Sequence, residues 1–142
     1  MRLVKDTNVF VAALRSGSGA SRQLLRLLLQ RRHCPLLSDK LWLEYLDVLG
    51  RGLEVWQGSA LTEDQRREAL GDFASVCEWV NITRLWRPNL PDEGDNHIME
   101  LAICGNAAAV VTFNTSDFTA ALFAPPGLMV LTPGEFLKNY NL

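Results

Sequence analysis

The stretch LVKDTNVFVAAL, residues 3–14, joins a short apolar run to an acidic side chain, Asp6, and then to a second apolar segment. A short apolar run of this kind predicts a buried strand that ends near Asp6. A carboxylate at the end of a buried strand is costly unless a partner compensates its charge. Asp6 is therefore interpreted as a functional residue, or one with a specific partner, rather than as an ordinary surface acid.

Downstream of this segment, apolar runs alternate with amphipathic stretches and turn signals. Helical spacing of apolar residues and capping residues predict helices over residues 20–32, 39–49, 62–76 and 96–104, and from 133 onward. Short apolar or alternating runs predict further strands at residues 35–37, 78–86, 107–113 and 128–131. The start of the last helix is defined most sharply, because Thr132 can cap it, Pro133 suits its first position and Glu135 completes a capping box.

Regular alternation of strands and helices predicts an α/β protein, a three-layer α/β/α sandwich with a central, mainly parallel five-stranded sheet. The 142 residues, of which 48% are hydrophobic, fit a single domain over residues 1–142. The net charge of −2 argues against a protein that coats nucleic acid by bulk electrostatics. The N-terminal apolar stretch is far shorter than the roughly 20 residues that span a bilayer, so we expect a cytoplasmic protein with no membrane contact.

Cysteine and histidine give no sign of a zinc site or of a disulfide framework. The three cysteines, Cys34, Cys77 and Cys104, are widely spaced and form no C-x-x-C motif. His33 and His97 have no cysteine or histidine neighbour at zinc-finger spacing, so each is interpreted as a surface or satisfied core residue. We expect the cysteines to be buried thiols.

Three further acids, like Asp6, lie on or next to predicted strands and helices. Glu44 lies on a predicted helix, Asp95 opens another, and Asp117 follows a strand. Each has an ordinary explanation, namely a solvated helix face, a helix N-cap and a turn cap respectively. In open α/β sheets, however, ligands bind outside the carboxyl ends of the strands, where remote acids can meet. Together the four acids predict an oxygen-rich site for a hard divalent cation.

Four segments together resemble a PIN domain, and the likeness extends over nearly the whole chain. Segment 3–14 resembles the opening strand of that family with its first acid. LSDKLWLEYLDVL, residues 37–49, resembles the helix that carries the second acid. DEGDNHIMELAICGNAAAVVTFNTSDF, residues 92–118, resembles the third and fourth acidic motifs, and GLMVLTPGEFL, residues 127–137, the closing strand and helix of VapC-like toxins.

The resemblance implies a Mg²⁺- or Mn²⁺-dependent endoribonuclease that hydrolyses RNA phosphodiester bonds. It also implies the toxin of a type II toxin-antitoxin pair, inhibited by a cognate antitoxin protein, and it allows a homodimer. The residues expected to be catalytic are Asp6, Glu44, Asp95 and Asp117. Of these, Asp6, Asp95 and Asp117 would bind the metal, and Glu44 would position or deprotonate the attacking water. Asn8 and Asn114 would contact the substrate or support the metal ligands.

Three positions depart from the family pattern. Asn114 stands where many PIN domains have an aspartate, and Gly94 replaces an acid that often precedes the residue equivalent to Asp95. Lys5 occupies a strand position that is commonly apolar, and we expect it to lie against the acids and compete with a cation. These departures support an alternative, a catalytically weakened PIN-like module that binds RNA or protein.

Overall fold

The computed structural model describes residues 1–140, which fold around one five-stranded sheet. The strand order is β3-β2-β1-β4-β5, and every neighbouring pair is parallel. The strands are β1 (Arg2–Lys5), β2 (Cys34–Leu37), β3 (Glu78–Trp79), β4 (Ala109–Val111) and β5 (Met129–Leu131). The predicted five-stranded parallel sheet is confirmed, with β1 at its centre.

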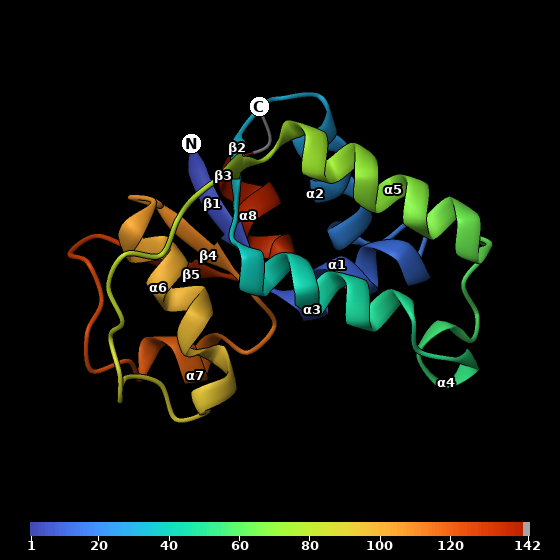
Figure 1. Cartoon of the computed structure of the whole chain (residues 1–142). Helices are drawn as coiled ribbons and strands as arrows, with labels where there is room; N and C mark the ends of the chain where they lie inside the picture. Colours follow the sequence, from blue (N-terminus) through green and yellow to red (C-terminus); the bar gives the residue numbers. More distant parts are fainter. Residues whose placement is uncertain (141–142) are drawn as a thin grey trace.

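Helices cover both faces of the sheet (Figure 1). One face carries α1 (Thr7–Arg15), α2 (Ala20–Leu29), α5 (Glu63–Val76) and α8 (Pro133–Tyr140). The other carries α6 (Asn96–Cys104) and α7 (Thr115–Thr119). Helix α3 (Asp39–Leu49) follows β2 and contacts α1, α5 and α6, and α4 (Leu53–Trp56) follows it. This arrangement confirms the three-layer sandwich. No helix within residues 1–140 has the length and apolar character needed to cross a bilayer.

The central strands are buried on both faces, which is why their sequences are continuously apolar. Leu3 and Val4 of β1 are fully buried, as are all three residues of β4. Several helices begin at the predicted residues because local capping bonds fix them. Ser38 Oγ accepts a hydrogen bond from Leu41 N at 3.2 Å. Thr132 and Glu135 exchange reciprocal bonds of 3.1 Å, which is a capping box.

The strand predicted over residues 78–86 is much shorter in the structure. It pairs with β2 only at Glu78 and Trp79, and Val80 N makes one more bond to Leu37 O at 2.8 Å. Strand β2 ends at Leu37 and α3 begins two residues later, so no partner edge extends beyond this point. The chain therefore continues as a long loop to the short 3₁₀ turn η1 (Glu93–Asp95) that precedes α6 (Figure 1).

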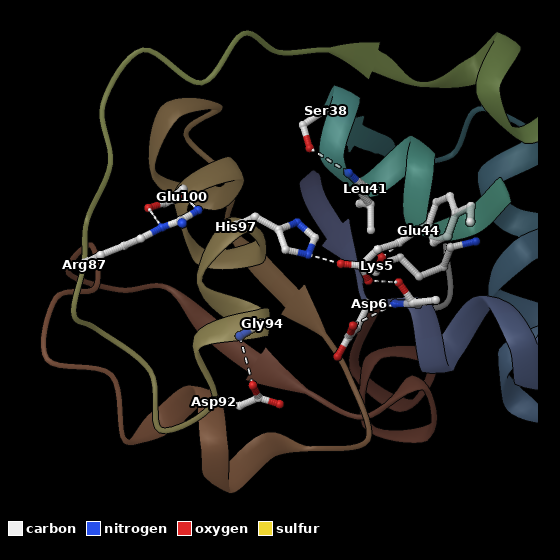
Figure 2. Close-up of polar contacts among 12 residues, drawn as sticks. Lys5, Asp6, Ser38, Leu41, Glu44, Arg87, Asp92, Gly94, His97 and Glu100 are labelled. Carbon is white, nitrogen blue, oxygen red and sulfur yellow. Dashed lines mark hydrogen bonds and ion pairs between the residues drawn. The ribbon is translucent and has the colours of Figure 1, made fainter. Parts of the chain in front are cut away.

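A buried carboxylate fixes this loop to α6. Glu100, which is 1% exposed, accepts hydrogen bonds from Trp86 N at 2.8 Å and from Arg87 Nε and Nη2 at 3.0 Å each (Figure 2). A buried carboxylate is tolerated only when its charge and lone pairs are matched, and a two-pronged guanidinium contact does this well. The pair therefore sets the path of the chain into η1 and Asp95.

We expect Arg87→Met to lower the free energy of unfolding by about 1–3 kcal/mol, because Glu100 then keeps a single backbone donor; half-exposure of Arg87 limits the loss. Urea unfolding measures the change. The matched control is Arg67→Met, which breaks an exposed pair with Glu63 and should cost about 0.5 kcal/mol or less. Equal losses in the two variants would contradict the role assigned to the buried pair.

Candidate functional site

Asp6 lies at the carboxyl end of the central strand, at the start of α1. Its backbone N–H donates to Val111 O of β4 at 2.9 Å, which continues the pairing of the two strands. One carboxylate oxygen accepts from Thr7 N at 2.7 Å, and the other accepts from Thr112 Oγ1 at 2.8 Å. Burial raises the pKa of Asp6, whereas these two hydrogen bonds favour its charged form. The carboxylate is thus fixed in orientation at the edge of the sheet.

Glu44 projects from α3 toward the same edge. Its Oε1 accepts from Thr7 Oγ1 at 2.8 Å, and its Oε2 is in ion-pairing contact with His97 Nε2 (Figure 2). Burial by itself would raise the pKa of Glu44, but the contacts with His97 and Thr7 outweigh burial and lower it. Glu44 is therefore a charged side chain held between two helices, α1 and α6, rather than part of a solvated stripe.

Two residues of the site were not among the predicted site residues. His97, interpreted above as a surface or satisfied core residue, is 4% exposed, and its Nδ1 has no hydrogen-bond partner within residues 1–140. Its position two residues after Asp95, at the start of a helix, was the available signal. Thr112 is fully buried, and its hydroxyl donates to Asp6 from the end of the neighbouring strand β4. Its signal was its position directly after an apolar strand.

Asp95 ends η1 and occupies the N-cap position of α6, yet its side chain makes no capping hydrogen bond. The ordinary explanation of this acid is therefore not what the structure shows. Burial, followed by the negative charges of Asp6, Asp92 and Glu44, raises the pKa of Asp95 to about 6, and His97 opposes this. The carboxylates of Asp6, after the end of β1, and of Glu44, on α3, thus lie close enough to act on Asp95.

Asp117 and Asn114 stand apart from this group. Asp117 lies in the first turn of α7, and Asn114 is exposed at the N-cap without a capping bond from its side chain. Asp117 is not among the charges that act on Asp6 or Asp95. The structure therefore brings together three of the four predicted acids. The assignment of Asp117 as a metal ligand stays a prediction, as do the roles of Asn8 and Asn114.

Lys5 does not lie against the acids, contrary to expectation. Its ammonium group is over the ring of Phe73, 3.7 Å from the centroid, with the rings of Phe10 and Tyr45 at 4.9 and 5.7 Å. Burial lowers the pKa of Lys5 to about 7, and no hydrogen-bond partner reaches its Nζ within residues 1–140. Successive side chains of a strand point to opposite faces, which separates Lys5 from the neighbouring Asp6.

Within residues 1–140, no three His, Cys, Asp or Glu side chains converge closely enough to enclose a metal ion on their own. The donors that do gather still fit a hard cation. Asp6 and Asp95 supply carboxylate oxygens from two chain segments, and the charge of Asp6 disfavours the charged form of Asp95. Mg²⁺ in particular keeps several waters and uses one or two carboxylates together with substrate phosphates, so a sparse set of protein ligands suits it.

Comparison with known proteins identifies the family and the fold. A family model described as the PIN domain matches residues 2–116. The fold is similar to that in the crystal structure of VapBC2 from Rickettsia felis bound to a DNA fragment from their promoter. That match has a TM-score of 0.62 and 20% sequence identity, and it covers 92% of this chain and 97% of the other. No curated protein matches the chain. Since the family model covers most of the sequence, the chain belongs to the PIN-domain family.

Proposed function

We propose that this protein is a Mg²⁺- or Mn²⁺-dependent endoribonuclease and the toxin of a toxin-antitoxin pair. The observation that carries the proposal is the gathering of Asp6, Glu44 and Asp95 at the carboxyl edge of a parallel sheet, where burial, and after it the charges of Asp6, Asp92 and Glu44, raise the pKa of Asp95. Ligands bind at this edge in open α/β folds. Membership of the PIN-domain family supports the same reading of the site.

Each side chain has a role that follows from its contacts. Asp6 and Asp95 would hold the cation, and Thr112 keeps Asp6 in a fixed orientation. When bound, a divalent cation supplies Lewis-acid polarisation of the phosphate and lowers the pKa of the attacking water. Glu44, held by Thr7 and His97, would orient that water or accept its proton. Asp117 would assist in metal binding from the start of α7.

The partner and the cellular setting are inferred from the same comparisons. The similar structure contains VapBC2 and promoter DNA, which supports the proposal of a cognate antitoxin for this chain. A cytoplasmic location and a homodimer are proposed from the resemblance to PIN-domain toxins alone. RNA is the proposed substrate. The exposed Asn114, in place of an acid, favours a second candidate function, a weakened module that binds RNA or protein without cleaving it.

We expect Asp6→Asn to reduce the metal-dependent cleavage of RNA at least about 100-fold, because it removes a charge at the reacting centre while keeping the shape of the side chain. Cleavage of a mixed RNA pool with and without Mn²⁺ is the measurement. Asp72→Asn, an exposed substitution on α5, is the matched control and should cleave like the wild type. Undiminished cleavage by Asp6→Asn would refute the assignment of Asp6, and lack of cleavage by the wild type would favour the binding module.

We expect Mn²⁺ to raise the melting temperature of the protein, because a ligand that binds only the folded state stabilises it, by about 2.7 kcal/mol at 100 times Kd. Thermal denaturation with increasing Mn²⁺ measures this shift. The double variant Asp6→Asn/Asp95→Asn should show no comparable rise, whereas Asp72→Asn should behave like the wild type. Equal shifts in all three proteins would mean that the two aspartates do not share a metal site.

We expect the metal-free protein to be destabilised through Asp95 as the pH rises. The pKa of Asp95 is raised from 3.8 to about 6, so the folded state binds its proton more tightly than the unfolded state does between these values. Stability contributed by this proton is present at low pH and is lost as the pH passes about 6. Urea unfolding in EDTA from about pH 4 to pH 7 should therefore show Asp95→Asn gaining stability relative to the wild type. A difference that stays constant with pH would be inconsistent with this shift.

A further inference from the structure

A cleft of about 480 Å³ opens directly beside the acidic site. Thr7, whose hydroxyl donates to Glu44, lies at one end, and Arg15 lies eight residues further along α1. At about 1.5 Å per residue, the cleft extends about 12 Å along this helix. A second hollow of about 380 Å³ shares Ala12 and Arg15 with it, so the depression continues past the arginine. The two hollows thus form one continuous groove that begins beside the acidic site and extends away from it.

The chemistry of the cleft differs from that of the acidic site. Its floor is apolar and includes Val11, Val48 and Val55. Its rim carries two exposed arginines, Arg15 and Arg51, so it has a cationic border in a protein whose net charge is −2. Arg51 is paired with an acid, because its Nη2 donates to Asp47 Oδ2 at 2.9 Å. Arg15, by contrast, has no acidic partner within residues 1–140. Arg15 is therefore the free cation of the cleft.

An exposed aromatic ring also lines the cleft. Phe113 is 49% exposed and directly follows Thr112, the residue that binds Asp6. A half-exposed ring beside a cation and an apolar floor suits a nucleotide, since bases of single-stranded RNA stack on aromatic side chains while cations contact the phosphates. A cleft of this volume is within the range of small-ligand sites.

We propose that this cleft binds the single-stranded RNA next to the scissile bond, with a base stacked on Phe113 and a backbone phosphate held by Arg15. The proposal deepens the ribonuclease function stated above and rests on it for the position of the scissile bond. The cleft and the acids share Thr7 and the Thr112–Phe113 segment, so a strand held in the cleft would present its next phosphodiester to Asp6. An RNA occupant is favoured over a protein because the rim is cationic and the acids adjoin it.

The test measures binding of a fluorescein-labelled oligouridylate in EDTA by anisotropy, at several salt concentrations. Arg15→Gln should weaken binding and reduce the slope of log Kd against log salt by about 0.7, the value for one phosphate contact in a single strand. Phe113→Leu should weaken binding about tenfold and leave the slope unchanged, because stacking carries no charge. With Mn²⁺, both variants should raise KM for cleavage more than they lower kcat.

Matched controls exist elsewhere on the chain. Arg26 is an exposed arginine in the last turn of α2, as Arg15 is in the last turn of α1, and it does not line the cleft. Phe123 is 48% exposed, almost as much as Phe113, and lines a different hollow beside Trp86. Arg26→Gln and Phe123→Leu should bind the oligouridylate like the wild type. Circular dichroism and melting temperature establish that all four variants are folded.

The outcomes separate this proposal from the proposed function. If the wild type cleaves RNA with Mn²⁺ but Arg15→Gln and Phe113→Leu bind and cleave like their controls, the cleft assignment is overturned and the ribonuclease stands. If both variants lose binding as expected but the wild type does not cleave, the cleft is an RNA-binding site, and the ribonuclease and the position of a scissile bond both fail. A labelled acidic amphipathic peptide that binds the wild type, is lost in both variants and is not displaced by oligouridylate would overturn the RNA assignment in favour of a protein groove.

Discussion

Parallel pairing of β1 with β4 is the constraint on which the site depends. It places Lys5 opposite Val111 and so brings Asp6 beside Thr112, 106 residues away in the sequence. The pairing extends by one bond, from Asp6 N to Val111 O, before the two chains separate into α1 and the segment leading to α7. Because both strands end at this level, the first acid, its hydroxyl donor and the exposed Phe113 all emerge at one edge of the sheet. A slip of β4 by one residue would move Thr112 and Phe113 to opposite faces and remove the hydroxyl donor from Asp6.

The residue before Asp6 has a separate structural role. Lys5 points into the core, where its ammonium group lies against the rings of Phe10, Tyr45 and Phe73, which belong to α1, α3 and α5. Contacts between a cation and aromatic faces offset part of the cost of burying the charge. Tyr45 also donates its hydroxyl proton to Lys5 O at 2.5 Å. The same cluster fixes α3 relative to β1, and α3 is the helix that carries Glu44.

The sequence was sufficient where the controlling interactions are local. Several helix starts were predicted because capping residues, such as Thr132 with Glu135, act within a few positions. It was insufficient where a feature depends on the angle or length of remote elements. The extent of β3 is limited by the end of β2, and the contact between Glu44 and His97 depends on how α3 crosses α6. Three of the predicted site residues, Asp6, Glu44 and Asp95, come together in the structure. Local sequence pattern could place each of them in its own element, but it could not show that the three elements bring them close to one another.

The contact between Glu44 and His97 has a consequence for the charge of the whole site. His97 favours the charged form of Glu44 and opposes the rise in the pKa of both aspartates. The charge of Glu44 is therefore partly matched by direct contact with His97, whereas Asp6 and Asp95 have no ion pair with a cationic side chain among residues 1–140 and Asp6 adds to the rise in the pKa of Asp95. A divalent cation would act on these two carboxylates first, and the cationic rim of the adjoining cleft would act on the phosphates of a bound strand. Negative charge is thus concentrated in the acidic site, where a metal would bind, and positive charge on the rim of the cleft, where the substrate phosphates would bind.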